Sequence, residues 1–307
     1  MQSKDSKVYS VIDIGTNTCL LLIARLTEKN LTKLFEAQEI PRLGRDLYRT
    51  GLISKEAFQS VLEIMREYIS ISKKYDAEKV FSFGTSAMRD ARNSSELIDF
   101  INLQTGIEIK ILTGEEEAKY GYEGATFDFK KGVQYAVLDI GGGSTEISFR
   151  KDQNIVSVSI DIGSVRIYEM FFKGIFNPAN IENARIFVIE NLCKTDYVIN
   201  NQLLIGVAGT LTTLSAIKNN LKEFDERVIH KDVLTFDEVN NIFRKLISMS
   251  ESERLASGSF MKGRSDVIVS GTLILIEIMN YFQIDSVNVS TKGLRYGLLL
   301  NIPDFYK

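Results

Sequence analysis

Two glycine turns, each preceded by an aspartate, contain the residue types best suited to chemistry. The second turn reads Asp139-Ile-Gly-Gly-Gly-Ser-Thr-Glu146. Glycines lack side chains, so backbone N–H groups in such a turn can approach a ligand closely. Ser144 and Thr145 add hydroxyl donors, and carboxylates at both ends suit a divalent cation that prefers oxygen ligands. The pattern favours a phosphate–metal site, with a glycine hairpin between two solvated acids as the alternative.

The first turn, Asp13-Ile-Gly-Thr-Asn-Thr18, resembles the second. Each aspartate ends an apolar run that predicts a buried strand, at 8–14 and 134–140. The two aspartates are 139 − 13 = 126 residues apart. A repeat of that length indicates a duplicated domain rather than a solenoid.

The elements around the turns predict an α/β fold. Strands expected at 8–14, 19–26 and 31–40 form a meander, and those at 134–140, 144–150 and 154–160 repeat it; helices and further strands follow each meander. We expect two domains, 1–127 and 128–307, with the terminal helix packing back on the first. The two turns would then face each other across a cleft, at strand ends where α/β sheets bind ligands.

The composition is that of a soluble globular protein. The chain has 307 residues, 44% of them hydrophobic and 25% charged, and a net charge of −3. This charge argues against a general nucleic-acid or membrane-surface binder. No apolar run approaches the roughly 18 residues of a membrane span, and the N-terminus lacks a signal-peptide pattern. We expect a cytoplasmic protein in which a local basic loop, containing Arg42 and Arg45, meets any polyanion.

Cysteine and histidine are too few for several kinds of site. Cys19 and Cys193 form no disulfide or metal pattern, and both lie in apolar surroundings that predict buried thiols. The single histidine, His230, excludes a His-cluster metal centre and disfavours a Ser-His-Asp triad. A packed or helix-terminal role is expected for it.

Three glutamates, 115–117, begin a predicted helix that runs to about residue 126. Thr113 with Glu116 is a capping-box pattern, and acids favour the first turn of a helix. From the residues, a solvated helix start is the simplest interpretation. Further helices are expected from 164 to 172 and from 263 to 281, and another opens at Gly209-Thr210, where amides can hold an anion.

Six motifs occur in the order found in one known family. They are Asp13-Ile-Gly-Thr-Asn-Thr, Thr85-Ser-Ala-Met-Arg-Asp-Ala-Arg-Asn93, Thr113-Gly-Glu-Glu-Glu-Ala118, Asp139-Ile-Gly-Gly-Gly-Ser-Thr-Glu146, Ala208-Gly-Thr210 and Gly293-Leu-Arg295. With them the chain resembles the exopolyphosphatase/guanosine pentaphosphate phosphohydrolase family, Ppx/GppA, over essentially its whole length. The resemblance implies two ribonuclease-H-like domains of the actin and sugar-kinase type, in the short two-domain form.

The resemblance also implies an activity, namely Mg²⁺-dependent (or other divalent-cation-dependent) release of terminal phosphate from inorganic polyphosphate, guanosine pentaphosphate, or both. It makes Glu117 the general base, which replaces the simpler interpretation of that residue. The implied metal ligands are Asp139 and Glu146. Asp13 is expected either to share the metal through a water or simply to cap its hairpin, and we take it as a third metal residue. The phosphate-binding residues would be Gly15, Thr16, Asn17, Gly141, Gly142, Gly143, Ser144, Thr145, Gly209, Thr210, Arg89, Arg264 and Arg295, with Arg42 and Arg45 guiding a polyanion.

Two departures and several alternatives stay open. Leu20 stands where family members often carry a basic residue, and Tyr296 replaces an acid that commonly follows Gly-Leu-Arg. Each arginine is as well suited to a structural ion pair as to phosphate. A non-catalytic sensor of guanosine tetra- or pentaphosphate or of polyphosphate, and an ATP-dependent kinase of the same fold, are the competing functions. A homodimer is a further possibility that the resemblance raises.

Overall fold

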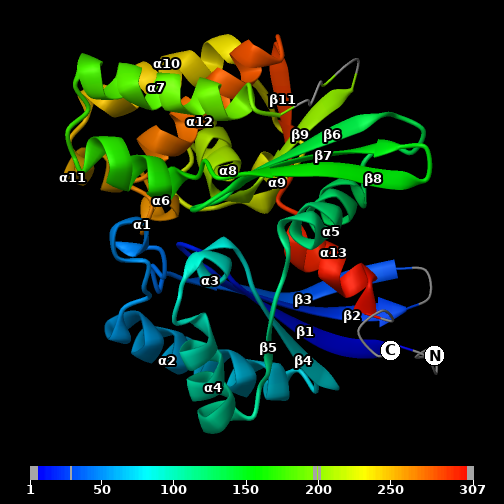
Figure 1. Cartoon of the computed structure of the whole chain (residues 1–307). Coiled ribbons are helices and arrows are strands. Elements are labelled where there is room, and N and C mark those ends of the chain that lie inside the picture. The colour runs from blue at the N-terminus through cyan, green and yellow to red at the C-terminus, as the bar shows by residue number, and fades with distance from the viewer. Residues whose placement is uncertain (1–5, 28–29, 196–198, 200–201, 303–307) are drawn as a thin grey trace. The chain divides into compact units, whose positions relative to one another are not determined.

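A computed structural model describes residues 6–27, 30–195, 199 and 202–302 of the chain. The described residues form two compact units, the first within Met1–Gly124 and Leu294–Lys307 and the second within Ala125–Gly293 (Figure 1). The C-terminal helix thus belongs to the first unit; the expectation was a domain of 128–307 whose terminal helix packs back on the first. The predicted domain bounds stay a prediction.

The first unit contains a mixed sheet with strand order β3-β2-β1-β4-β5 in its described part. Strands β1 to β3 are antiparallel neighbours, and β4 and β5 run parallel to β1. The elements are β1 (Lys7–Ile14), β2 (Cys19–Thr27), β3 (Asn30–Glu39), α1 (Leu47–Thr50), α2 (Lys55–Lys74), β4 (Lys79–Gly84), α3 (Ser86–Asp90), α4 (Ser94–Thr105), β5 (Ile109–Ile111), α5 (Gly114–Thr126) and α13 (Leu294–Leu300).

Alternation along β1 decides which residues face which helices. Ile12 and Ile14 belong to the apolar core formed with α2 and α4. Successive side chains on a strand point to opposite faces, so Val11 and Asp13 lie on the other face. Figure 1 shows α2 and α4 on one side of this sheet and α13 on the other. The position of Asp13 is therefore set by the period of the strand.

The second unit has the same strand arrangement with one addition. Its sheet order is β10-β11-β9-β6-β7-β8 in the part described, with β6 to β8 antiparallel and β9 and β11 parallel to β6. The elements are β6 (Tyr135–Ile140), β7 (Thr145–Lys151), β8 (Asn154–Ile160), α6 (Ser164–Ile167), the π-helix η1 (Tyr168–Phe172), α7 (Pro178–Leu192), β9 (Leu203–Val207), α8 (Ala208–Lys218), α9 (Glu226–Ile229), β10 (Val233–Thr235), α10 (Phe236–Ser248), α11 (Glu251–Leu255), the 3₁₀ turn η2 (Ser259–Met261), α12 (Ile268–Tyr281) and β11 (Ser286–Val289).

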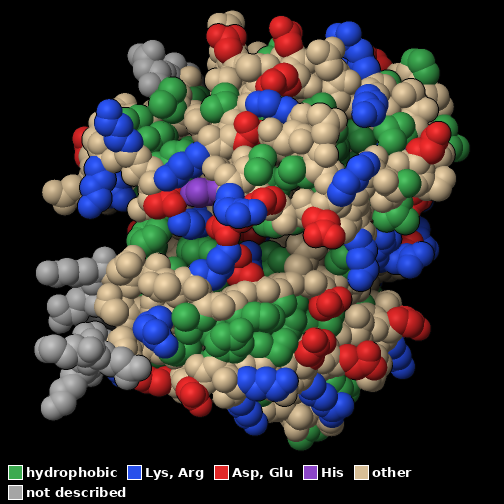
Figure 2. All heavy atoms as spheres, turned by 180° about the vertical axis from the view of Figure 1, so that it is seen from behind, with side chains coloured by type: hydrophobic (Ala, Val, Ile, Leu, Met, Phe, Trp, Pro, Cys, Tyr) green, Lys and Arg blue, Asp and Glu red, His purple; other side chains and the backbone are tan. Residues whose placement is uncertain are grey.

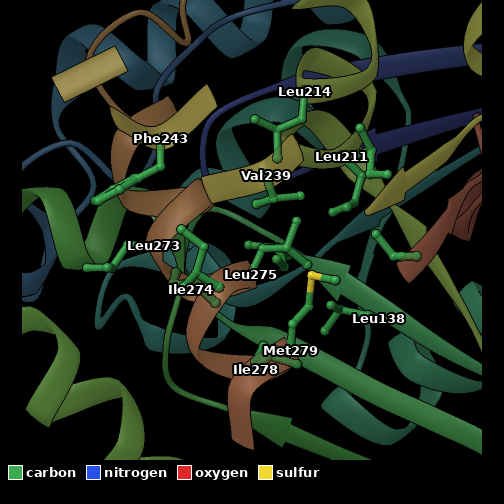
Figure 3. Close-up of a cluster of buried hydrophobic side chains, with 14 of the residues drawn as sticks. Leu138, Leu211, Leu214, Val239, Phe243, Leu273, Ile274, Leu275, Ile278 and Met279 are labelled. Atoms are coloured by element: carbon green, nitrogen blue, oxygen red, sulfur yellow. The ribbon is translucent and has the colours of Figure 1, made fainter. Parts of the chain in front are cut away.

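The core of the second unit surrounds α12. Twelve consecutive residues of this helix, 268–279, are buried. Figure 3 shows Leu275 of α12 beside Val239 of α10, and leucines of α8 belong to the same cluster. Leu138 of β6 joins the same cluster. Although α12 is very apolar, it has 14 residues, and no helix in the described residues is long and apolar enough to span a bilayer.

Some local expectations were wrong. The predicted helix 164–172 is helical over that range, although it becomes a π-helix after Ile167, but the predicted helix 263–281 begins only at Ile268, after a run of turns. The short strand β10 was missed, since three residues are too few for a detectable period. Cys19 is buried as expected, but Cys193 is exposed because it follows the last turn of α7.

His230 lies in a hydrogen-bonded cluster of charged side chains in the second unit. Its Nε2 lies 3.0 Å from Oδ2 of Asp128, which also accepts a 2.6 Å hydrogen bond from Lys292. Burial raises the pKa of Asp128, but the hydrogen bonds from His230 and Lys292 more than offset this and hold it well below its usual range. The histidine, purple in Figure 2, is surrounded by cationic and acidic side chains. His230 also caps the end of α9, which confirms the packed, helix-terminal expectation.

Candidate active site

Asp13 ends β1 in the first unit as a partly buried acid. Its cross-strand partner on β2 is Leu20, so no second charge sits opposite it. Within the described residues, its buried Oδ1 accepts no hydrogen bond. Burial raises the pKa of this carboxyl to about 7, the negative charge of Glu117 adds to the rise, and Arg295 opposes it. A buried, unsatisfied carboxylate oxygen is rare in proteins and favours a bound ion or water.

The turn 15–18, which follows Asp13, is supported from behind by a second loop. The turn is closed by a 2.9 Å hydrogen bond from its first amide to its last carbonyl. The amide of Arg42 donates to the carbonyl of Asn17 at 3.2 Å, and that of Gly44 donates to Thr16 at 2.8 Å. A methyl group at Gly44 would lie 2.2 Å from Cγ2 of Thr16, so the two loops pack in direct contact. The basic loop is thus fixed to the predicted phosphate turn.

The three glutamates at the start of α5 have different environments. Glu115 is exposed. Glu116 and Thr113 form the predicted capping box, with reciprocal hydrogen bonds of 3.0 and 3.1 Å, and Glu116 also binds Lys110 at 2.8 Å. The Glu117 side chain is 12% exposed. Solvation at the helix start is therefore found for Glu115, the predicted cap for the half-buried Glu116, and neither for Glu117.

Glu117 is held by Arg89 of α3. Nη1 of Arg89 donates to Oε2 of Glu117 at 2.5 Å and to the carbonyl of Leu112 at 3.0 Å. Burial raises the pKa of Glu117, and the charge and hydrogen bond of Arg89 oppose that rise. The result is a carboxylate in fixed orientation whose basicity exceeds that of an ordinary glutamate.

In the second unit, Asp139 and Glu146 are directly paired across β6 and β7. Like charges in such a position destabilise a sheet unless they are neutralised. Oε1 of Glu146 accepts hydrogen bonds from the hydroxyls of Ser144 at 2.6 Å and Ser159 at 2.7 Å. Glu146 is buried, with 2% of its surface exposed, so these bonds fix the carboxylate in one orientation.

The turn 141–144 is also supported from behind by a loop. Its first three carbonyl oxygens accept hydrogen bonds of 2.8 to 3.2 Å from the segment 164–166, the third from Nε of Arg166. A methyl group at Gly163 would lie 2.4 Å from the carbonyl oxygen of Gly142. These three carbonyls are therefore directed toward this loop, while the amide of Gly141 closes the turn by donating to the carbonyl of Ser144 at 3.0 Å.

The amides of Gly142 and Gly143 donate no hydrogen bond to any part of the chain that the structure describes. Gly143 is buried, and buried amides are rarely left unpaired. Successive N–H groups in a turn form a concavity that binds anions. The predicted phosphate-binding role of these glycines fits this geometry.

A further anion-binding arrangement lies at the start of α8. Ala208 has a left-handed φ of 67°, a conformation that costs an alanine about 1 to 2 kcal/mol. The guanidinium of Arg264 packs against Gly209, where a methyl group would lie 2.5 Å from Nε. Burial lowers the pKa of Arg264 to about 10, so it stays cationic at neutral pH. Helix amides and a buried arginine therefore lie close together at the start of α8, and the phosphate-binding role of these residues stays a prediction.

Some predicted ligands have structural partners instead. Arg295 donates to the carbonyl of Leu21 at 2.9 Å and lies 3.3 Å from Glu36, which favours an ion-pair role. The buried hydroxyl of Thr145 donates to the carbonyl of Ile162. A methyl group at Gly271 would lie 2.3 Å from Oγ1 of Thr210, so that side chain packs on α12. Their roles in phosphate binding stay predictions.

The Asp139–Glu146 pair fits Mg²⁺ by its chemistry. Mg²⁺ is commonly bound by one or two carboxylates together with waters and substrate phosphates. A directly opposed acid pair supplies such ligands. Within 6–27, 30–195, 199 and 202–302, no group of three or more His, Cys, Asp or Glu side chains forms a metal cage. The three-ligand set that includes Asp13 stays a prediction.

Comparison with known proteins identifies the family. Residues 22–304 match the Ppx/GppA phosphatase family. The chain belongs to this family. A bifunctional 3-dehydroquinate synthase/phosphatase of Fusobacterium nucleatum is 35% identical over 315 residues, which cover 97% of this chain and 47% of that protein. Exopolyphosphatase 2 of Mycobacterium tuberculosis is 30% identical over 313 residues, covering 95% of this chain and 98% of the relative.

The fold agrees with that of a solved Ppx/GppA protein. The Aquifex aeolicus family member superposes with a TM-score of 0.81 at 27% identity, over 98% of this chain and 99% of its own. The predicted α/β class with two ribonuclease-H-like domains is thereby confirmed. The chain spans about half the length of the Fusobacterium relative.

Sequence reasoning missed two residues of this Ppx/GppA site, Ser159 and Arg166. A signal for Ser159 was present, because the two-residue turn after Lys151 sets the β7–β8 register and places Ser159 opposite Glu146. No such local signal existed for Arg166, whose contact with Gly143 joins residues 23 positions apart.

Proposed function

We propose that this protein hydrolyses the terminal phosphoanhydride bond of inorganic polyphosphate or guanosine pentaphosphate with Mg²⁺ or another divalent cation. The observation that carries the proposal is the environment of Glu117, a withdrawn carboxylate held by Arg89 with a raised pKa. Family membership supports it, since relatives bear the names exopolyphosphatase and guanosine-5′-triphosphate,3′-diphosphate pyrophosphatase.

Glu117 acts as the general base toward the attacking water. Arg89 holds Oε2, and Oε1 accepts the water proton while the water oxygen bonds to phosphorus. The bond from phosphorus to the bridging oxygen breaks, and the shortened phosphate chain keeps the electron pair. A raised pKa makes Glu117 a stronger base than an ordinary carboxylate. Arg89 is a positioning residue in this scheme.

The glycine turns and the start of α8 bind phosphate oxygens. Phosphoryl transfer depends on alignment and charge stabilisation more than on covalent work by the protein. The amides of Gly142 and Gly143 supply donors, and the buried guanidinium of Arg264 adds positive charge beside the α8 amides. These groups are held by the folded backbone before substrate arrives, which avoids reorganisation during the reaction.

Asp139 and Glu146 would hold the divalent cation. When bound, Mg²⁺ neutralises oxygens of the transferred phosphoryl group. Ser144 and Ser159 orient the Glu146 carboxylate for this task through their hydroxyl donors. Removal of the cation by EDTA is expected to stop phosphate release, and addition of Mg²⁺ to restore it.

The general-base role of Glu117 is tested by comparing Glu117→Gln with a control, Glu115→Gln, which removes one exposed charge from the same helical turn. Glu117→Gln is expected to lower kcat for phosphate release by about 100-fold or more, and Glu115→Gln to stay near wild type. Because only the ionised carboxylate accepts a proton, the wild-type rate should fall as pH drops through the raised pKa of Glu117. Steady-state release of phosphate from polyphosphate and guanosine pentaphosphate, measured against pH, checks both points.

Other outcomes point to the competing functions. Near wild-type turnover by Glu117→Gln would remove the general-base assignment. Binding of polyphosphate or guanosine pentaphosphate by the wild-type protein without phosphate release would favour the sensor, and ADP production in a phosphate-acceptor-dependent assay would favour the kinase.

A further inference from the structure

The first unit contains a surface cavity of about 920 Å³ beside the basic loop. It lies among the loop that follows β3, helix α1 and the first turns of α2 and α4, and its lining includes Arg42, Arg45, Arg49, Lys55 and Asn93. Ligand sites in proteins usually have volumes of about 300 to 1,000 Å³. The cavity is thus large enough for a chain of several linked phosphates.

One wall of the cavity is attached to the predicted phosphate turn of the first unit. The amides of Arg42 and Gly44 donate to the carbonyls of Asn17 and Thr16. Arg42 itself has a left-handed φ of 53°, which holds the loop in an unusual path. A polyanion leaving the turn 15–18 would therefore meet this wall directly.

The loop is anchored by apolar residues and presents arginines at the surface. Leu43 and Leu47 are 1% and 7% exposed and belong to the core of the first unit. Arg45 and Arg49, which alternate with them, are exposed. Because the leucines hold the backbone of the loop in place, a ligand that binds the arginines does not have to overcome the entropic cost of ordering that loop.

The charges of the lining favour an anion. Its cations are Arg42, Arg45, Arg49 and Lys55, and its acids are Asp46, Glu56 and Glu96. Oδ1 of Asp46 already accepts from Nη2 of Arg49 at 3.2 Å. Glu56 lies at the start of α2, where a backbone hydrogen bond and that of Ser54 lower its pKa. The lining has one more cation than acids, 4 − 3 = 1, in a chain whose net charge is −3.

The lining lacks one of the two usual platforms for a nucleobase and supplies the groups that bind linked phosphates. Among the described residues that line the cavity, none is aromatic. Proteins commonly bind a nucleobase by stacking it on an aromatic ring or an arginine plane, whereas linked phosphates need donors and positive charge. Arginine is well suited to phosphate because its planar fork can bind two oxygens together.

We propose that this cavity is a subsite for internal phosphates of an inorganic polyphosphate whose end is hydrolysed at the site described above. The inference rests on the proposed function, and it makes long polyphosphate a better substrate than guanosine pentaphosphate. Phosphates beyond the scissile bond bind Arg45 and Lys55, so affinity grows with chain length until the cavity is filled.

The test uses the double variant Arg45→Ala/Lys55→Ala in the full chain. The control is Arg25→Ala, which removes an exposed arginine of β2 opposite Val8, at the far end of the first sheet from the turn 15–18. Dissociation constants and KM values are measured with long-chain polyphosphate, tripolyphosphate and guanosine pentaphosphate. A second double variant, Arg45→Gln/Lys55→Gln, and a thermal melt verify that the effect does not come from unfolding.

Loss of two exposed cation–phosphate contacts is expected to weaken long-chain binding about tenfold. The KM for long chains should rise by a similar factor, and those for tripolyphosphate and guanosine pentaphosphate should rise much less. Arg25→Ala should behave as wild type. The loss should shrink at high salt, because surface charges are then screened.

The outcomes separate the subsite from the proposed function. Phosphate release from polyphosphate with an unchanged ratio of long-chain to tripolyphosphate KM in the double variant overturns the subsite and leaves the hydrolase intact. An equal loss for guanosine pentaphosphate also overturns it. No release from any substrate by wild type overturns the function, while a tenfold loss of long-chain binding in the same preparation supports the subsite.

Discussion

The two glycine turns have the same backbone design and different side chains. In each unit an aspartate ends the first strand, a turn follows, and a loop after the third strand donates hydrogen bonds to the carbonyls of the turn. The residue opposite the aspartate differs. It is Leu20 in the first unit and Glu146 in the second, at equivalent positions, since 20 + 126 = 146.

This difference shows how a duplicated scaffold divides its chemistry. The second unit has an acid pair suited to a cation, and the first has Asp13 facing an apolar partner. The first unit instead has Glu117 and Arg89, contributed by α5 and α3. The backbone hydrogen bonds that orient the turns are alike in both units, because any anion site of this kind needs its amides exposed. The charged side chains determine what each half does.

Neutralising the aspartates gives the largest expected effect and tests this division. Asp139→Asn should lower kcat by about 1,000-fold, because it removes a proposed cation ligand. Asp13→Asn should lower it by about tenfold. Phosphate release over a range of Mg²⁺ concentrations checks both variants, and Asp139→Asn should also raise the Mg²⁺ requirement. Equal losses in the two variants would contradict the unequal roles of the turns.

The loops that support the two turns differ in what a methyl group added at their glycine, Gly44 or Gly163, would contact. Gly163→Ala would contact the backbone of Gly142, at 2.4 Å, and Gly44→Ala would contact the Thr16 methyl, at 2.2 Å. We expect Gly163→Ala to lower the free energy of unfolding by about 3 kcal/mol and Gly44→Ala by about 1 kcal/mol. Thr16→Ser removes the methyl and should rescue Gly44→Ala. Urea unfolding of the single and double variants measures this, and a failed rescue would contradict the contact.

Ser159→Ala gives the smallest expected effect and tests the orientation of Glu146. Loss of its 2.7 Å hydrogen bond should weaken Mg²⁺ binding about tenfold, a typical cost for a residue that positions a metal ligand. Calorimetric Mg²⁺ titration, alongside the Mg²⁺ dependence of phosphate release, is the measurement. Ser157→Ala on the same strand, opposite Ser148, is the matched control. Similar Mg²⁺ affinities for both variants and the wild type would show that the hydrogen bond from Ser144 alone is enough to orient Glu146.

Much of the local structure could be predicted because it depends on neighbours in the chain. The capping box of Thr113 and Glu116 spans three residues, and its hydrogen bonds occur as predicted. The pairing of Asp139 with Glu146 follows from the strand period and the length of the turn. The short strand β10 was not predicted, because three residues are too few for a detectable period, and the change to a π-helix after Ile167 was not predicted either.

The sequence by itself determined that there are two similar turns, which strand ends carry acids, and which glutamate completes the cap. The helical pattern alone did not separate Glu117 from Glu115, and only the family resemblance pointed to Glu117. Tertiary structure gives the two glutamates different environments, because it brings Arg89, 28 residues away, onto Glu117 and leaves Glu115 exposed. It also paired Arg295 with Glu36 and attached the basic loop to the turn 15–18. Contacts between residues far apart in the sequence depend on how strands and helices pack, so they cannot be predicted from the spacing of residues along the chain.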